Sequence, residues 1–280
     1  MSVPSVIAPE ELSPSCLLLD TRARDAFQQG HLPGALSAEL DATLSLATAP
    51  GADPARGGRH PLPSPGQWAR QLGAWGITES SWVVAYDDAG GGSGAARLWW
   101  MLRAFGHERV AVLDGGLQGA LEAGLTLTTA LTPVAAAPPY PGERWRWPTV
   151  ELAQVDRLRQ NPAWKVLDVR ARPRFLGETE TLDPVAGHIP GALNLPFADN
   201  LDARGHFRSP EALRKLYLDF LDGTPPERLA VHCGSGVTAC HTLLALELAG
   251  LPGATLYVGS WSEWCRSGRK LAKGAEPGQG

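Results

Sequence analysis

The stretch Val231-His232-Cys233-Gly234-Ser235-Gly236-Val237-Thr238-Ala239-Cys240 places a cysteine between two kinds of secondary structure. The apolar run Leu229-Ala230-Val231 predicts a short buried strand, and the apolar residues from Thr238 to Leu248 predict a helix. The two glycines beside Ser235 allow the backbone to curl, so that several N–H groups point inward at the start of the helix. We therefore expect Cys233 to lie in an anion-binding turn.

This position bears on the chemistry of the thiol. A thiolate is the nucleophilic form of cysteine, and both a helix N-terminus and several N–H donors favour it. The sequence therefore makes Cys233 a candidate nucleophile. The alternative is a buried structural cysteine, and the Gly-Ser-Gly turn that follows Cys233 favours the functional interpretation.

Composition limits the class of protein. A chain of 280 residues suits two domains of about 140 residues each. With 44% hydrophobic and 19% charged residues it can bury substantial cores, and its net charge of -4 gives no support for nucleic-acid binding. The four cysteines show neither a CxxC motif nor a Cys/His ligand spacing, which argues against a metal site and a disulfide scaffold.

The sequence also predicts where the protein acts. Residues 1–10 lack the basic and long apolar regions of a signal peptide. No stretch has the roughly 18 apolar residues of a membrane span, so we expect no membrane association. Free cysteines suit a reducing compartment, and the predicted location is the cytoplasm.

The chain contains an internal repeat. Three short motifs occur in the same order in both halves, which predicts one duplicated domain. Each copy alternates short apolar strands with helical stretches, as expected for an α/β fold with a mainly parallel sheet flanked by helices. The paired motifs are Leu17–Arg22 with Lys165–Arg170, Gly30–Ala35 with Gly187–Ala192, and Val84–Asp87 with Ala230–Cys233.

The two copies differ at the position of the nucleophile. Asp87 stands in the first half where Cys233 stands in the second, so the first copy is predicted to be degenerate and non-catalytic. A Pro- and Ala-rich stretch separates the copies and predicts a linker. The expected division is a non-catalytic domain over 1–131, a linker over 132–148 and a catalytic domain over 149–280.

Two further pairs of motifs occur in both halves. The Asp-x-Arg pairs, Asp20/Arg22 and Asp168/Arg170, are present even in the half without a cysteine. We therefore interpret them as structural ion pairs that tie a strand end to a loop. The His-x-Pro-Gly-Ala turns at His31 and His188 are interpreted in the same way, as turn and hydrogen-bond features.

The loop Cys-Gly-Ser-Gly-Val-Thr, residues 233–238, resembles the active-site loop of the rhodanese superfamily, in the form typical of 3-mercaptopyruvate sulfurtransferases. The resemblance extends over nearly the whole chain and implies two tandem rhodanese-like domains. It also implies that Cys233 carries a persulfide, with the residues after it wrapped around the sulfur. The residues that would form this binding loop are Gly234, Ser235, Gly236, Val237 and Thr238.

The activity implied by the resemblance is transfer of sulfane sulfur from 3-mercaptopyruvate to a thiol or cyanide, with release of pyruvate. It requires no metal or organic cofactor, because the persulfide carries the group. Cyanide, glutathione, a thioredoxin-like protein or another protein thiol all fit as the acceptor. The sequence decides neither the acceptor nor the oligomeric state, nor whether Cys240 or Cys265 has a redox role beside the simpler one of packing.

By the same resemblance, Arg174 binds the carboxylate of the substrate, because an arginine before the aromatic residue has this role in mercaptopyruvate sulfurtransferases. A guanidinium holds a carboxylate at two points. A second arginine usual in that family would fall in the segment 179–184, which contains none. The alternative for Arg174 is a solvated surface charge.

The stretch Arg59-His60-Pro61-Leu62-Pro63 resembles the family's element that places a histidine against the active-site loop. The resemblance further implies that Asp41, His60 and Ser235 form a relay that moves a proton to or from the substrate. Histidine suits proton transfer near neutral pH, and a carboxylate can fix its tautomer. Without the resemblance, His60 would be an ordinary loop histidine.

Two other functions remain open. Thiosulfate is an alternative sulfur donor, although rhodaneses proper place basic side chains in the loop, where this chain has Gly234, Ser235, Gly236 and Val237. A non-enzymatic sulfur-relay or binding module is the other alternative. It would require an intact loop around Cys233 that performs no turnover.

Overall fold

The computed structural model describes residues 3–92 and 94–276, which form two compact units. The first unit consists of Met1–Leu46, Leu62–Trp147 and Ala203–Phe207. The second consists of Ala47–Pro61, Pro148–Asp202 and Arg208–Gly280. Each unit therefore contains a short segment from the opposite half of the chain.

The first unit is built on a parallel sheet of five strands in the order β1-β5-β4-β2-β3. Its central strands are short apolar runs such as Val-Val-Ala-Tyr, buried on both faces, as parallel sheets require. The strands are β1 Val6–Ile7, β2 Leu17–Asp20, β3 Leu36–Ser37, β4 Val83–Tyr86 and β5 Val110–Leu113. The helices are α1 Arg24–Gln29, α2 Leu40–Thr43, α3 Pro65–Ala74, α4 Ala95–Phe105 and α5 Gly116–Glu122, with a 3-10 turn at Pro9–Glu11.

The second unit has a parallel sheet of five strands in the order β6-β10-β9-β7-β8. Its strands are β6 Thr149–Val150, β7 Lys165–Asp168, β8 Leu193–Asn194, β9 Leu229–His232 and β10 Thr255–Tyr257. Its helices are α6 Leu152–Leu158, α7 Arg172–Leu176, α8 Pro210–Leu221, α9 Thr238–Leu248 and α10 Ser260–Trp264. Two 3-10 turns lie at Phe197–Asn200 and Pro226–Arg228.

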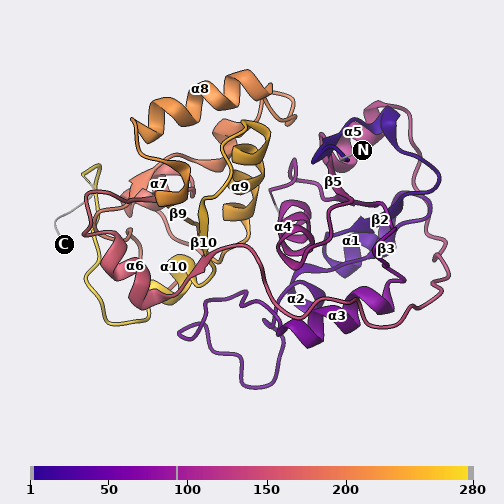
Figure 1. The fold of residues 1–280 in the computed structure, drawn as a ribbon, viewed down its shortest axis with the longest axis horizontal. Helices are drawn as coiled ribbons and strands as arrows, with labels where there is room; N and C mark the ends of the chain where they lie inside the picture. Colours follow the sequence, from indigo (N-terminus) through magenta and orange to yellow (C-terminus); the bar gives the residue numbers. More distant parts are fainter. Residues whose placement is uncertain (1–2, 93, 277–280) are drawn as a thin grey trace. The chain divides into compact units, whose positions relative to one another are not determined.

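The two sheets have the same strand order, element by element, which confirms the predicted duplication and the α/β fold class. The register also repeats: Asp20 lies opposite Tyr86 in the first sheet, and Asp168 lies opposite His232 in the second. In the second unit α6, α7 and α10 share an apolar cluster on one face of the sheet, and α8 and α9 lie on the other (Figure 1). The active-site loop follows β9, the central strand of this sheet.

The stretch predicted to be a linker packs on the first unit. Tyr140 donates its backbone N–H to the carbonyl of Ala69, and Arg146 donates its own to Ala104. The ring of Trp145 packs at 6.1 Å from that of Trp100 in α4. The domain limits at 131 and 149 remain predictions, and residues 140, 145 and 146 between them contact α3 and α4 of the first unit.

Short segments complete each unit from the other half of the chain. Asp114, after β5, accepts the backbone N–H of Phe207 at 2.9 Å and faces Nδ1 of His206 at 3.1 Å. In the second unit, Gly57 donates its N–H to the carboxylate of Glu263 at 2.8 Å. Over the described residues, no helix has both the length and the apolar character that crossing a membrane requires.

Candidate active site

Cys233 follows directly after β9, and α9 begins at Thr238. The backbone between them curls around the sulfur. The N–H groups of Ser235 and Gly236 donate to Sγ of Cys233 at 3.5 and 3.2 Å. Cys233 is only 2% exposed. Donors in this arrangement and the positive end of α9 stabilise negative charge on the sulfur. The curled turn predicted from the two glycines is therefore present, with two N–H groups directed at the sulfur.

The glycines of the loop have different reasons to be glycine. Gly236 has φ of +75°, and a β-carbon there would lie 2.6 Å from the carbonyl oxygen of Val258. Gly234 has an ordinary φ, but a β-carbon there would lie 2.9 Å from a guanidinium nitrogen of Arg59. Gly236 is therefore required by the backbone, whereas a side chain at Gly234 would displace the end of the Arg59 side chain. Of the other predicted loop residues, Val237 is buried and Thr238 is partly exposed.

Residues at the start of α10 form hydrogen bonds with the backbone of the loop. The hydroxyl of Ser260 accepts the N–H of Cys233 at 3.2 Å and donates to the carbonyl of Tyr257 at 2.9 Å. Trp261 and Ser262 donate their backbone N–H groups to the carbonyls of Cys233 and Gly234. These bonds fix the cysteine backbone, so the direction of the Sγ atom is set by a rigid element.

His60 lies against the loop, as the sequence predicted. Its Nδ1 is 2.7 Å from Oγ of Ser235. The segment that carries His60 is held by a hydrogen bond from its backbone: Arg59 donates its N–H to the hydroxyl of Ser262 at 3.0 Å. Asp41 lies in α2 of the first unit, and its predicted role toward His60 remains a prediction.

Arg174 lies in α7. The carboxylate of Glu180, which follows this helix in the chain, binds one edge of the Arg174 guanidinium. Nε of Arg174 donates to Glu180 at 3.2 Å, and Nη2 donates to the same carboxylate at 2.7 Å. Burial raises the pKa of Glu180, but the N–H of Leu182 and the charge of Arg174 outweigh it, so this pKa lies below its ordinary value. Glu180 is therefore ionised at neutral pH and holds Arg174 in place.

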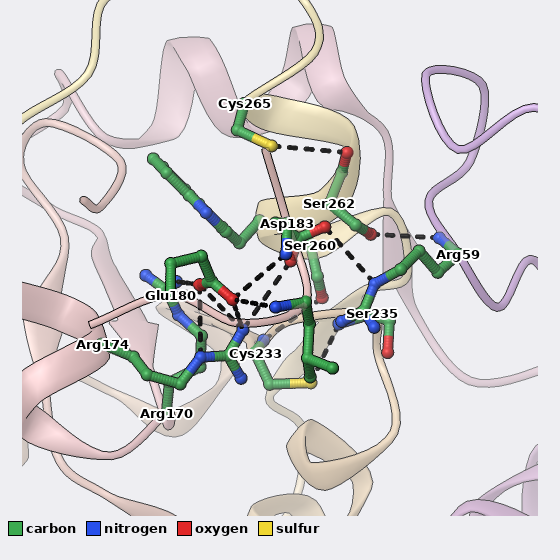
Figure 2. Close-up of polar contacts among 12 residues, drawn as sticks. Arg59, Arg170, Arg174, Glu180, Asp183, Cys233, Ser235, Ser260, Ser262 and Cys265 are labelled. Atoms are coloured by element: carbon green, nitrogen blue, oxygen red, sulfur yellow. Dashed lines mark hydrogen bonds and ion pairs between the residues drawn. The ribbon is translucent and has the colours of Figure 1, made fainter. Parts of the chain in front are cut away.

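Asp183 forms ion pairs with three arginines near the loop (Figure 2). Its carboxylate is fully buried and lies 3.4 Å from Nε of Arg59, 3.7 Å from Nη2 of Arg174 and 2.8 Å from Nη1 of Arg266. Sequence reasoning missed Glu180, Asp183 and Arg59, since their spacing matches neither a helix nor a strand. The one available signal for Arg59 was its position next to His60.

The Asp-x-Arg pairs are structural ion pairs, as predicted. Nη2 of Arg170 lies 2.6 Å from Asp168 and donates to the carbonyl of Gly187 at 2.7 Å, so it ties the end of β7 to a turn. Arg22 makes the matching contacts with Asp20 and Gly30. Burial raises the pKa of Asp168, but Arg170 and His232 outweigh it, and the pKa lies below its ordinary value. The negative charge of Asp168 is thus retained beside the loop.

The histidines of the two repeated turns make backbone hydrogen bonds. Nδ1 of His31 lies 2.9 Å from the carbonyl of Phe27, and Nδ1 of His188 lies 2.8 Å from that of Phe175. Each imidazole also stacks on the same phenylalanine at 3.8 Å. Both histidines are buried, which confirms their interpretation as turn features.

The corresponding loop of the first unit is filled by a carboxylate. Asp87 accepts N–H bonds from Ala89 and Gly91 on one oxygen and from Gly94 and Ala95 on the other, all between 2.8 and 3.1 Å. The side chain thus occupies the centre of its own loop. Among the described residues of this loop, the Asp87 carboxylate stands where the Cys233 thiol stands in the second unit, and the lack of catalysis by the first unit remains a prediction.

The remaining cysteines of the second unit have different environments. Cys240 is fully buried in α9 and donates its thiol to the carbonyl of Gly236 at 3.3 Å. Cys265 is partly buried, and burial together with the charge of Asp183 raises the pKa of its thiol. In the part of the chain that the structure describes, no three His, Cys, Asp or Glu side chains are grouped to bind a metal ion.

Comparison with known proteins places this geometry in a family. The model of the rhodanese-like domain matches residues 9–123 and 151–267. The probable 3-mercaptopyruvate sulfurtransferase of Pseudomonas aeruginosa is 43% identical, over 92% of each chain. The human 3-mercaptopyruvate sulfurtransferase is 38% identical over 86% of this chain and 79% of its own, and the mouse thiosulfate sulfurtransferase is 36% identical over 91% and 86%.

Solved structures agree with the sequence matches. The 3-mercaptopyruvate sulfurtransferase from Leishmania major superposes with a TM-score of 0.78 at 29% identity, covering 94% of this chain and 74% of its own. An anaerobic ergothioneine biosynthesis enzyme from Chlorobium limicola, at 22% identity and a TM-score of 0.80, shares the fold. With both halves matched by the family model and a loop built around Cys233, the chain belongs to the rhodanese family as a member with two rhodanese-like domains.

Proposed function

We propose that this chain is a sulfurtransferase that takes a sulfur atom from 3-mercaptopyruvate onto Cys233 and passes it to a thiol or to cyanide. The observation that carries the proposal is the pair of N–H groups, from Ser235 and Gly236, that donate to Sγ of Cys233. A thiolate, and the persulfide formed from it, are the groups that such a loop stabilises. The names of the relatives from Pseudomonas aeruginosa and human support the same donor.

In the first half-reaction the Cys233 thiolate attacks the sulfur of mercaptopyruvate. The new S–S bond forms as the C–S bond breaks, and the electron pair of that bond goes to the carbon, giving the enolate of pyruvate. A proton then converts the enolate into pyruvate. The enzyme is left with a Cys233 persulfide, so no cofactor is needed to carry the sulfur.

In the second half-reaction the acceptor attacks the outer sulfur of the persulfide. A thiolate acceptor becomes a persulfide and cyanide becomes thiocyanate, and in both cases Cys233 leaves as a thiolate. The same loop donors stabilise this leaving group. A small thiol, cyanide and a thioredoxin-like protein all meet the chemical requirement for the acceptor.

The surrounding residues have separate roles in this scheme. Arg174 binds the substrate carboxylate, and its guanidinium is oriented by Glu180. The Ser235 hydroxyl and His60, 2.7 Å apart, supply or remove the proton, and Asp41 is proposed to fix the tautomer of His60. Gly234, Gly236, Val237 and Thr238 form the loop around the transferred sulfur.

Thiosulfate is the second candidate donor. The specific observation in its favour is the cluster of cations beside Cys233, since guanidiniums bind a small dianion as well as a carboxylate. The mouse relative is named for that substrate. Against thiosulfate, the loop itself carries no basic side chain.

A cytoplasmic location remains part of the proposal.

Steady-state turnover with mercaptopyruvate and with thiosulfate, measured side by side, tests this function. We expect faster release of pyruvate from mercaptopyruvate by the wild type, no turnover by Cys233→Ser, and normal turnover by Cys16→Ser as a control in the first unit. Mass spectrometry after donor alone should find one added sulfur on Cys233. Preference for thiosulfate would favour the second candidate, and no Cys233-dependent turnover with either donor would leave a non-enzymatic relay or binding module.

A further inference from the structure

Ser260 has a backbone conformation that residues with a side chain rarely adopt. Its φ is +54°, and among the residues that the structure describes Asp222 is the other one that combines a positive φ with a side chain. Asp222 is the C-cap of α8, where this conformation is common. Ser260 instead begins a helix, α10, and it is fully buried. Backbone strain of this kind persists only where the surrounding structure imposes it, and it is concentrated at functional sites.

The hydroxyl of Ser260 connects the ends of two neighbouring strands. Cys233 comes directly after β9, and Tyr257 is the last residue of β10, which pairs with β9. The hydroxyl accepts the N–H of Cys233 at 3.2 Å (Figure 2). It also donates to the carbonyl of Tyr257 at 2.9 Å. The buried N–H of Cys233 thus has an acceptor beyond the end of its strand, in a place where the chain must provide one.

The first unit offers an internal comparison. Leu117 donates its backbone N–H to the carbonyl of Asp87 there, as Trp261 donates to the carbonyl of Cys233 in the second unit. The residue before Leu117 is Gly116, whose φ is +56°, so the same turn occurs with and without a side chain. A β-carbon at Gly116 would lie 2.4 Å from the carbonyl oxygen of Asp87. The unit that contains the cysteine therefore keeps a strained serine where its duplicate has a glycine.

The strain at Ser260 is offset by its contact with Cys233. Glycine adopts a positive φ without the steric cost that a β-carbon brings, so the backbone alone favours glycine at this position. The serine side chain adds one buried hydrogen bond to the backbone of Cys233. The sulfur of Cys233 in turn receives N–H groups from Ser235 and Gly236 at 3.5 and 3.2 Å, and such bonds weaken steeply as the atoms move apart or out of line. The bond to Ser260 therefore keeps the sulfur within reach of its donors.

We propose that Ser260 is a positioning residue, whose strained side chain fixes the backbone of Cys233 and thereby maintains the reactivity of its sulfur. This inference rests on the proposed function, because it concerns the same cysteine. Ser260 acts through the peptide N–H of Cys233 and not on the substrate. Loss of the hydroxyl leaves the fold in place but lets the sulfur move away from its N–H donors. Less of the thiol is then present as thiolate near neutral pH, and both half-reactions become slower.

Alkylation by iodoacetamide tests the proposal without relying on turnover. The thiolate displaces iodide and forms one S–C bond, so the rate constant depends on the amount of thiolate and on its accessibility. The ratio of the rate constants at about pH 7 and about pH 9 cancels the accessibility and reports how far the loop favours the thiolate at the lower pH. Peptide mass spectrometry follows Cys233 together with Cys16, which lies in the first unit and serves as the reference thiol.

Ser260→Gly and Ser260→Ala separate the hydrogen bond from the backbone strain. Both variants lose the hydroxyl, so we expect both to lower the alkylation ratio at Cys233 by about fivefold to tenfold. Only Ser260→Gly relieves the positive φ, so its urea midpoint should lie above that of Ser260→Ala. Asp222→Gly and Asp222→Ala are the matched control, since Asp222 has φ of +45° and is exposed at the end of α8. They should show the same order of urea midpoints with no change in the ratio at Cys233.

The steady-state counterpart is a fall of about tenfold in kcat/KM for mercaptopyruvate in Ser260→Gly. Ser260→Gly carries the least strain, so it decides the test even where Ser260→Ala does not fold. A wild-type alkylation ratio in Ser260→Gly would overturn the proposal. So would a ratio that follows the urea midpoint through both variants, which would make Ser260 only a support for the fold. A lowered ratio in Ser260→Gly, together with no turnover of either donor by the wild type, would instead overturn the proposed function and leave the positioning role standing.

Discussion

Nδ1 of His60 lies 2.7 Å from Oγ of Ser235, although 175 residues separate the two in the chain. Ser235 is also the residue whose N–H donates to Sγ of Cys233. One residue of the loop thus contacts the sulfur through its backbone and the histidine through its side chain. This links any proton transfer by His60 to the position of the Cys233 sulfur.

The contact between His60 and Ser235 predicts that the two act as a unit. Ser235→Ala and His60→Gln should each lower kcat with mercaptopyruvate, by about 100-fold, because proton transfer is lost. The double variant should be no slower than the slower single variant, since removal of either residue breaks the same path. Multiplicative losses in a double-mutant cycle would contradict the relay, and exposed Ser80→Ala provides the control.

Gly236 and Gly223 offer a matched pair for the geometry of the loop. Their φ angles are +75° and +79°, but a β-carbon meets Val258 at 2.6 Å only at Gly236, and nothing within 4 Å at Gly223. Gly223→Ala should cost about 1 to 2 kcal/mol of stability for its backbone conformation alone. Gly236→Ala should cost more and lower turnover by about 100-fold, because the donors around Cys233 shift. Equal effects on denaturant midpoints and kcat would show that the loop tolerates a side chain.

We expect the carboxylate of Asp87 to stabilise the first unit. Asp87→Ala removes the acceptor of four backbone N–H groups and should lower the free energy of unfolding by about 3 kcal/mol or more. Asp87→Asn keeps the shape but offers one acceptor oxygen, so an intermediate loss is expected. Urea unfolding measures both, with exposed Asp88→Asn as the control. No loss in Asp87→Ala would mean that the loop reorganises without its central anion.

His232 predicts a dependence of stability on pH. Burial lowers its pKa, only partly offset by the charge of Asp168, so the folded protein keeps this imidazole neutral below its ordinary range. The unfolded chain binds a proton near pH 6.5, so this contribution to stability is complete above that pH and falls as the pH is lowered toward the folded pKa.

His232→Gln should therefore reduce the slope of unfolding free energy against pH below about 6.5, by up to about 1.4 kcal/mol per pH unit relative to the wild type. Denaturant unfolding at a series of pH values between about 7.5 and 5 measures this difference. An identical slope in the variant and the wild type would mean that His232 is protonated equally in the folded and unfolded states.

Local sequence determined much of this protein. Apolar runs such as Leu229–Val231 became buried strands, and the Gly-Ser-Gly turn became the cradle around Cys233. The Asp-x-Arg pairs formed ion pairs in both units, because each aspartate ends a strand and the arginine two residues later folds back onto it. The repeat predicted two sheets of equal order, since similar patterns of burial and turns form similar units.

Only the tertiary structure decided which distant residues meet at the site. Arg59 has no periodic relation to Gly234, and it reaches the loop because residues 47–61 pack with the second unit. Glu180 and Asp183 lie in a loop without helical spacing, so nothing local indicated that they hold Arg174. A strand or turn is determined by dihedral preferences and burial within a few residues. These contacts, by contrast, depend on how segments far apart in the sequence pack together in the folded protein. The candidate nucleophile, Cys233, could therefore be identified from the sequence, but its cationic surroundings became visible only once the chain was folded.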